Sequence, residues 1–108
     1  IQEAFLHEVQ AIIEAHLDDP EFGVPALSTL LAMSQTVLYK KIKALTGMSV
    51  QDFIRNTRLK KAARLLLETD MHVNEVAFAV GYSDRKYFSK EFKKQYGKSP
   101  SEFTGGEA

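Results

Sequence analysis

The chain contains one sequence pattern twice, about fifty residues apart. Residues 38–53 and residues 88–103 align without a gap, and a short apolar segment with a tight turn precedes each copy. The turn before the second copy is longer by one residue. The matched pairs are Lys40 and Lys90, Lys43 and Lys93, Gly47 and Gly97, Ser49 and Ser99, and Phe53 and Phe103. A short helix, a turn and a Lys-rich helix are typical of a helix-turn-helix unit, so the sequence predicts two such units.

Apolar residues recur at helical spacing along most of the chain, and turn residues separate these segments. We expect helices over residues 2–18, 25–32, 35–46, 50–68, 73–80 and 84–96, with a last short helical turn beginning at Ser99-Pro100. Ser49 is the expected N-cap of the longest helix. No segment is convincing as a strand. The predicted fold class is all-α: about seven helices form two homeodomain-like lobes, over about 1–49 and 69–108, joined by a connector helix over about 50–68.

Both Lys-rich helices are amphipathic when their residues are placed at intervals of about 100°. One face of the first helix carries Leu38, Ile42 and Leu45. The opposite face carries Thr36, Lys40 and Lys43. One face of the second helix carries Phe88, Phe92 and Tyr96, and the opposite face carries Lys86, Lys90 and Lys93. Each helix is therefore expected to bury its apolar face and to present a basic stripe outward.

Two further helices are expected to complete the cores. The first helix should pack on the first helix-turn-helix unit through Phe5, Val9, Ile12 and Ile13. Its acids Glu3, Glu8 and Glu14 should then face solvent or another protein. The predicted apolar stripe of the connector helix consists of Phe53, Ile54, Leu59, Ala62, Ala63, Leu66 and Leu67.

The charges of the chain are strongly separated along the sequence, although the net charge of the 108 residues is zero. Residues 1–39 contain six acids and no Lys or Arg, for a net charge of −6, whereas residues 40–108 have a net charge of +6. Such a separation indicates a surface that binds a polyanion. On charge alone, an ordinary solvated helix surface explains the lysines equally well.

The repeat favours DNA as the polyanion, because solvation does not require lysines at matched positions. A helix fits the major groove of B-DNA, where Lys can donate to guanine and a Thr methyl group can contact thymine. A helix of about nineteen residues is about 28 Å long. Successive major grooves on one face of DNA are about 34 Å apart. The connector helix is therefore compatible with two DNA-reading helices in adjacent grooves.

Residues 73–103 resemble the second helix-turn-helix unit of the AraC/XylS family of transcription regulators. The matching features are Val76-Ala77, Gly81-Tyr82, Tyr87-Phe88, Phe92-Lys93, Gly97, Ser99-Pro100 and the aromatic Phe103. The first unit and the connector resemble the same family at Met33-Ser34, residues 38–41, Gly47, Phe53-Ile54, Arg58-Leu59, Ala62 and Leu66-Leu67. The chain departs from the family at Ala32, where the family often has the glycine of the turn, at Ser28 and at Thr104. The resemblance covers about residues 5–104.

This resemblance implies sequence-specific binding of double-stranded DNA, with both Lys-rich helices acting as recognition helices in adjacent major grooves. Carried over by position, the base-reading residues are Thr36, Tyr39, Lys40, Arg85, Lys86, Ser89 and Lys90. Contacts to the DNA backbone are expected from Ser34, Lys41, Lys43, Lys93 and the amide ends of the recognition helices.

The chain is also similar to the C-terminal domains of response regulators and of hybrid sensor-kinase regulators. The first residue is Ile, so we expect a piece of a longer cytoplasmic regulator with a receiver domain upstream. The partners that the resemblance implies are RNA polymerase and, for the full-length protein, a second copy in a dimer. No cysteine is present, which suits a reducing compartment. No membrane contact is expected.

The sequence argues against an enzyme. The three histidines lack the spacing of a metal-binding motif, and no glycine-rich phosphate loop is present. We therefore expect no catalytic residues, no metal and no cofactor. The main alternative to DNA binding is a helical module that binds another protein through its acidic first helix.

Overall fold

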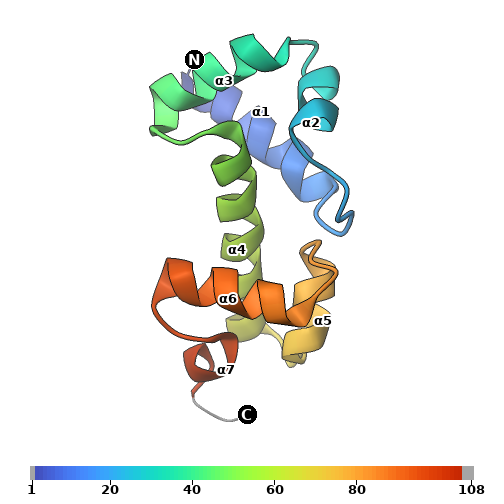
Figure 1. Cartoon of the computed structure of the whole chain (residues 1–108), viewed down its shortest axis with the longest axis vertical. Coiled ribbons are helices and arrows are strands. Elements are labelled where there is room, and N and C mark those ends of the chain that lie inside the picture. Colours follow the sequence, from blue (N-terminus) through green and yellow to red (C-terminus); the bar gives the residue numbers. More distant parts are fainter. Residues whose placement is uncertain (1, 106–108) are drawn as a thin grey trace. The chain divides into compact units, whose positions relative to one another are not determined.

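The computed structural model describes residues 2–105, whose regular secondary structure is helical (Figure 1). The helices are α1 (Gln2–Ala15), α2 (Val24–Leu30), α3 (Gln35–Thr46), α4 (Val50–Glu68), α5 (Val73–Ala79), α6 (Arg85–Tyr96) and α7 (Pro100–Phe103). No strand occurs in these described residues, so the predicted all-α fold class with seven helices is confirmed. Within the same range, no helix combines the length and the apolar character that a membrane span needs.

The chain forms two compact units, each with its own hydrophobic core. The first unit contains the described residues up to Leu17 together with Glu21–Thr57. The second unit contains the short segment Asp18–Pro20 and the described residues from Arg58 onward. Helix α4 belongs to both units, because the border between them falls after Thr57.

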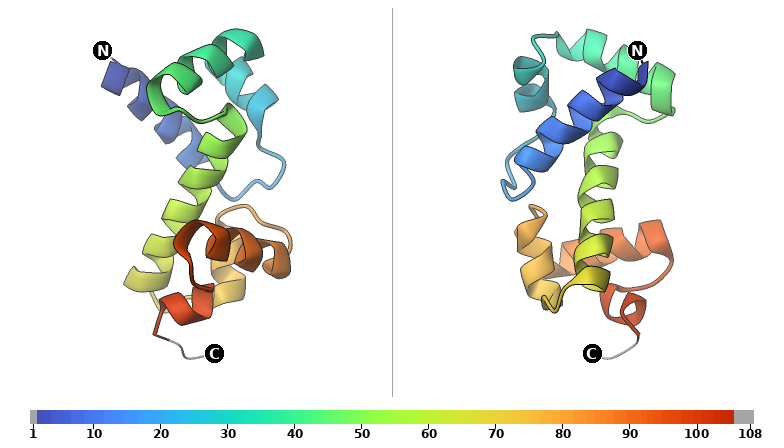
Figure 2. Two further views of the ribbon diagram at one scale, coloured as in Figure 1. Left: turned by 60° about the vertical axis from the view of Figure 1, so that its left-hand side comes forward. Right: turned by 180° about the vertical axis from the view of Figure 1, so that it is seen from behind.

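The core of the first unit joins α1, α2, α3 and the first half of α4 (Figures 1 and 2). Val9 and Ile13 from α1 are fully buried with Leu38 and Ile42 from α3, as predicted. Phe5 and Ile12 pack on this core while partly exposed, and Leu45 is also only partly buried. The acids Glu3, Glu8 and Glu14 are exposed, as the amphipathic pattern of α1 predicted.

The core of the second unit is built around aromatic side chains of α6. Phe88 and Phe92 are fully buried, and their ring centroids are 5.7 Å apart. The ring of Phe92 also contacts Tyr96 at 4.7 Å and Phe103 at 5.1 Å. Aromatic pairs at these separations stabilise a core beyond their buried area. They attach the short helix α7 to α6.

The buried stripe of α4 changes phase where the helix passes from one unit to the other. Phe53, Ile54 and Thr57 are buried in the first half, but the positions that would continue their spacing are Lys60, Lys61 and Arg64. The second half instead buries Leu59, Ala62, Ala63 and Leu66. Each half of α4 thus buries the side chains that face the core of its own unit.

Six of the seven residues predicted for this stripe are buried, and one prediction was wrong. Leu67 was expected in the apolar stripe of the connector, but its side chain is 64% exposed. One residue corresponds to about 100° around a helix, so the position after the buried Leu66 points away from the core. Leu65, which was not predicted, packs on that core instead.

Hydrogen bonds from polar side chains fix the helix ends close to the predicted positions. The Ser49 hydroxyl accepts from the Asp52 amide at 3.1 Å, which confirms Ser49 as the N-cap of α4. Ser99 and Glu102 form a reciprocal capping box at the start of α7. The hydrogen bonds from Ser99 lower the pKa of the Glu102 carboxyl. Helix α1 ends at Ala15, three residues before its predicted end, in a turn over residues 16–18.

Candidate nucleic-acid interface

The two helix-turn-helix units have turns with the same hydrogen-bond pattern. In the first, the Met33 amide donates to the Ser28 carbonyl at 3.0 Å, and in the second the Tyr82 amide donates to the Ala77 carbonyl at 2.9 Å. The residue before each of these amides has a positive φ, which is 56° at Ala32 and 91° at Gly81. The second turn contains the extra residue that the repeat predicted, since five residues separate α5 from α6 and four separate α2 from α3.

Ala32 therefore adopts the left-handed conformation that the second unit assigns to glycine. It is the only non-glycine residue with a positive φ in the described part of the chain. A Cβ atom makes this conformation cost roughly 1–2 kcal/mol. The left-handed turn also ends α2 at Leu30, two residues before the predicted end.

Side-chain caps start both Lys-rich helices, α3 at its predicted first residue and α6 one residue after the predicted one. The Ser34 hydroxyl accepts from the Val37 amide at 3.1 Å at the start of α3. The Asp84 carboxylate accepts from the Lys86 amide at 2.9 Å at the start of α6. Both helices end at a glycine in the left-handed conformation, Gly47 and Gly97. The capping hydrogen bond gives Ser34 a structural role in addition to any contact with DNA.

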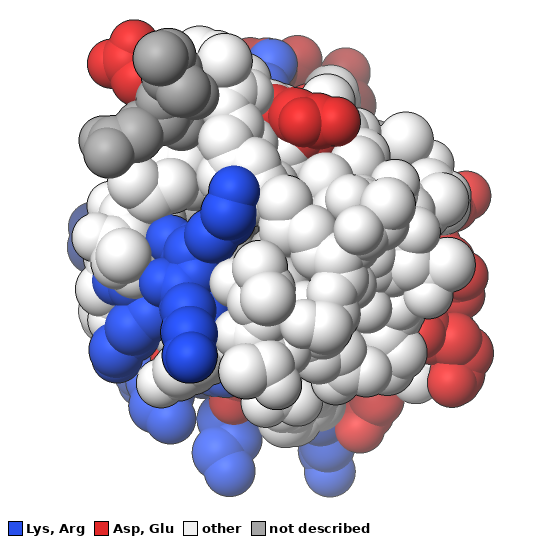
Figure 3. All heavy atoms as spheres, turned by 90° about the horizontal axis from the view of Figure 1, so that it is seen from above, with Lys and Arg blue, Asp and Glu red and all other residues white. Residues whose placement is uncertain are grey.

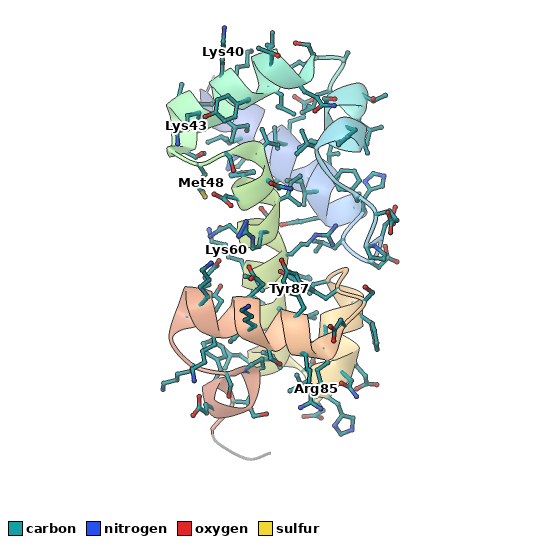
Figure 4. The ribbon with its side chains drawn as sticks, viewed as in Figure 1. Lys40, Lys43, Met48, Lys60, Arg85 and Tyr87 are labelled. Carbon is teal, nitrogen blue, oxygen red and sulfur yellow. The ribbon has the colours of Figure 1, made fainter. Side chains whose placement is uncertain are left out.

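The outward face of α3 carries its candidate residues in exposed positions. Thr36, Tyr39 and Lys40 are exposed, and Figure 4 shows Lys40 pointing away from the rest of its unit. The candidates for the DNA backbone also make local contacts. The Lys43 ammonium donates to the Gly47 carbonyl at 3.0 Å, and the Lys41 ammonium lies 5.0 Å from the centre of the Phe5 ring.

The exposed charged side chains on the outward face of α6 are lysines. Lys86, Lys90 and Lys93 are exposed, and Ser89 is half-buried. The one acid of α6, Glu91, is 7% exposed and therefore contributes little to the outer surface of the helix. Because α3 contains no acid, the outer surfaces of both helices have the same sign of charge.

Arg85 lies apart from the other candidate residues of α6. It lines an open groove of about 470 Å³, which it shares with residues such as His72, Asn74, Ser101 and Thr104. Figure 4 shows Arg85 and Tyr87 directed to different sides of α6, as expected for residues about 200° apart around a helix. The structure thus groups Lys86 and Lys90 together and places Arg85 beside α5 and α7.

Many basic residues gather on one part of the surface, although ion pairs such as that of Arg64 and Glu68 also place opposite charges side by side. Figure 3 shows one face of the molecule, on which a patch of Lys and Arg side chains lies left of centre and most Asp and Glu side chains lie at the right and at the top. In the described part of the first unit, the lysines are Lys40, Lys41 and Lys43 of α3, whereas three of the five acids, Glu3, Glu8 and Glu14, lie on α1. The lysines and most of the acids of this unit therefore lie on different helices, while Arg55 and Asp52 of α4 form an ion pair with each other.

A buried arginine supports the turn of the second unit. The guanidinium of Arg58 donates to the Val80 carbonyl at 2.6 Å and to the Asp19 carbonyl at 3.0 Å. Burial lowers the pKa of Arg58, while Tyr82 and Asp19 favour its charged form. Val80 is the C-cap of α5, so Arg58 satisfies a carbonyl at the point where the turn to α6 begins.

Two exposed apolar residues of the Lys-rich helices were not identified in the sequence. Val37 on α3 is 45% exposed and Tyr87 on α6 is 54% exposed. They occupy matched positions, fifty residues apart, immediately before the buried Leu38 and Phe88. Extending the repeat by one residue toward the N-terminus would have found the pair.

The sequence profile of the helix-turn-helix domain family matches residues 27–105. The C-terminal domain of the two-component response regulator yesN from Fusobacterium nucleatum has 34% sequence identity and a TM-score of 0.82, covering 94% of this chain and 98% of that one. The DNA-binding domain of AdpA, solved in complex with a target DNA, has 30% identity and a TM-score of 0.82, covering 92% and 88%. The chain belongs to the AraC-type helix-turn-helix family. It is a DNA-binding domain of the kind found in transcription regulators and is not itself an enzyme.

The curated relatives are much longer than this AraC-type domain. Histidine kinase P4 of Formosa agariphila is 37% identical over 103 residues, which are 95% of this chain and 8% of the kinase. The chain spans between 32% and 37% of three other relatives, which are regulatory proteins. In these relatives, the matched domain is thus a minor part of the protein.

Proposed function

We propose that α3 and α6 are the two recognition helices of this domain and that they enter adjacent major grooves of one DNA duplex. The observation that carries the proposal is the matched pair of outward cations, Lys40 and Lys90, each on a capped helix that follows a turn of the same geometry. The relative AdpA, whose DNA-binding domain was solved with its target DNA, supports DNA as the ligand of this domain.

Within this proposal, the exposed side chains of the two helices divide into two roles. The residues proposed to read bases are Thr36, Tyr39, Lys40, Lys86, Ser89 and Lys90. Ser34, Lys41, Lys43 and Lys93 are proposed to contact phosphates. Arg85 remains a proposed base-reading residue, although its position in the groove beside α5 also suits a phosphate.

Binding of the chain to a pool of random duplexes, followed by footprinting of the selected sites, tests the proposal. The expected footprint has two protected patches, with centres about one helical turn apart. Lys40→Ala should weaken one patch and Lys90→Ala the other. A single patch that both variants weaken equally would contradict the use of two grooves.

The salt dependence of binding separates this function from that of a protein-binding module. Release of counterions predicts that the logarithm of the binding constant falls steeply and linearly with the logarithm of the salt concentration. A module that docks another protein through α1 would show no such dependence with duplex DNA. Its affinity for a partner would instead depend on Glu3, Glu8 and Glu14.

The whole protein is proposed to be a cytoplasmic, signal-responsive regulator that uses this domain as its output. The similarity to a response-regulator domain and to part of a histidine kinase supports a receiver domain elsewhere in the protein. RNA polymerase is the proposed partner during regulation, and a dimer is the proposed full-length form. Light scattering of the full-length protein, with and without phosphorylation of the receiver, tests the dimer.

A further inference from the structure

Val37 and Tyr87 form a matched pair of apolar side chains on the outer surfaces of the two Lys-rich helices. Both are about half exposed, at 45% and 54%, and neither belongs to the buried cores of the units. Leaving large apolar side chains in water is unfavourable, and the arrangement occurs at the same position of both helices. The repetition indicates a shared contact that the isolated domain lacks.

Helical geometry places each apolar residue beside a candidate base-reading lysine. Residues three apart are neighbours on the surface of a helix, so Val37 lies next to Lys40 and Tyr87 lies next to Lys90. The Tyr87 ring is also held on one side, because its centroid lies 5.8 Å from that of the buried Tyr82. The remaining surface of the ring is open to solvent and is already positioned for contact.

The major groove offers one apolar group to such a side chain, which is the C5 methyl group of thymine. Cytosine, adenine and guanine present hydrogen-bonding groups in this groove, and unmodified cytosine has no methyl group. A lysine that donates to guanine and a neighbouring apolar side chain that contacts thymine would together read two bases. The second contact would discriminate thymine without any hydrogen bond.

We propose that Val37 and Tyr87 each contact the C5 methyl group of a thymine in the operator, one in each major groove. The proposal rests on the proposed function, since it requires α3 and α6 to enter the groove. It adds a second type of base recognition to that of the lysines. It also predicts a thymine close to the base that each lysine reads.

Replacement of single thymines by uracil tests the proposal, because uracil lacks only the methyl group. Each thymine of the selected operator is replaced in turn, and the dissociation constant is measured for the wild-type chain. One thymine in each half of the site should show a loss of about fourfold, the factor for removing one buried methyl-sized group. Val37→Ala should abolish the loss in one half only, and Tyr87→Ala in the other half only.

Three variants serve as controls for this experiment. Leu30→Ala and Phe78→Ala remove exposed apolar side chains outside α3 and α6. Both variants should lose affinity on uracil replacement at the same thymines and by the same factor as the wild type. Tyr87→Phe keeps the ring and removes the hydroxyl group, so it should keep the sensitivity to uracil. Circular dichroism melts of all variants establish that each is folded.

Several results would overturn the proposal while leaving the proposed function intact. One such result is an operator without thymine in the protected bases. Another is a wild-type chain whose affinity does not change when any thymine is replaced by uracil. The third is that Val37→Ala and Tyr87→Ala lose affinity on uracil replacement at the same positions as the wild type. If Tyr87→Phe no longer loses affinity on uracil replacement, the wild-type contact is a hydrogen bond from the Tyr87 hydroxyl and not a contact of the ring with the methyl group. Failure of the wild-type chain to select any duplex would instead contradict the proposed function itself.

Discussion

Ala32 and Gly81 show how a single residue decides the energy of a turn. Both have a positive φ at the same place in their helix-turn-helix units, and the flanking amides make equivalent hydrogen bonds. Only Gly81 lacks the Cβ atom that makes this conformation unfavourable. The first turn is therefore held in place by its surroundings, against the local preference of its own sequence.

Ala32→Gly is expected to stabilise the first unit by about 0.5–1 kcal/mol. Relief of the left-handed strain, roughly 1–2 kcal/mol, exceeds the greater entropy that glycine gives to the unfolded chain, about 0.5–1 kcal/mol. Chemical denaturation measures the change in the free energy of unfolding. Gly81→Ala is the matched control and should destabilise the second unit by about 1 kcal/mol or more. Equal effects of the same sign in both variants would contradict this account.

Lys40→Ala and Lys90→Ala should each reduce affinity for the operator by roughly 1–3 kcal/mol, if their ammonium groups donate to guanine. Both side chains are exposed at matched positions, so their removal should leave the fold unchanged. Titration against operators with single-base changes is the decisive measurement. A base reader loses its preference at one position, whereas a uniform loss over all operators would identify a phosphate contact.

At the scale of the helix, α6 combines an outer surface for binding with an inner surface for folding. Its lysines are exposed on one side, and on the other Phe88 and Phe92 fill the core of the second unit. Helix α7 has only four residues and is fixed by its capping box and by the contact between Phe103 and Phe92. The orientation of α6 within its unit therefore depends on aromatic packing.

Phe92→Ala should cost about 3–5 kcal/mol of stability, because it removes a fully buried aromatic side chain and leaves a cavity. Thermal and chemical unfolding measure the loss. Phe78→Ala is the matched control, since its ring is 56% exposed and its removal should change stability by no more than about 0.5 kcal/mol. Similar melting temperatures for the wild type and Phe92→Ala would show that the ring contributes little to the core.

Over the whole molecule, the exposed lysines of α3 and α6 suit a domain that attracts DNA. The acids of α1 are exposed, and α1 uses its apolar residues to pack in the first unit. At physiological salt, a charge acts over about 8 Å. Acids that lie farther than this from DNA should affect its binding only weakly.

Replacement of Glu3, Glu8 and Glu14 together by Gln should therefore change DNA affinity by less than about tenfold, a difference of roughly 1.4 kcal/mol. Binding assays at several salt concentrations provide the measurement. The matched control replaces Lys40, Lys41 and Lys43 by Gln, which should weaken binding much more and reduce the dependence on salt. If the triple Glu variant binds more than tenfold tighter, α1 lies close to the DNA.

Features that depend on neighbouring residues in the sequence were predicted accurately. Helices α3 and α4 begin and end as expected, because caps such as Ser49 and the glycines that follow helices act within one turn. The two outward basic stripes were also predicted, since amphipathic spacing fixes which face of a helix is buried. The roles of individual residues toward DNA stay predictions.

Features that depend on distant residues were decided by the tertiary structure. The predicted stripe of α4 already contained the buried residues Leu59, Ala62, Ala63 and Leu66, but the sequence could not show that Leu65 packs on the second core while Leu67 is exposed, because both are leucines beside the buried Leu66. The placement of Arg85 beside α5 and α7 also comes from folding, as does the left-handed conformation of Ala32. Local sequence determines where helices form and which face of each helix is apolar. Packing between helices then decides which of these apolar residues are buried, and it can hold a residue such as Ala32 in an unfavourable conformation.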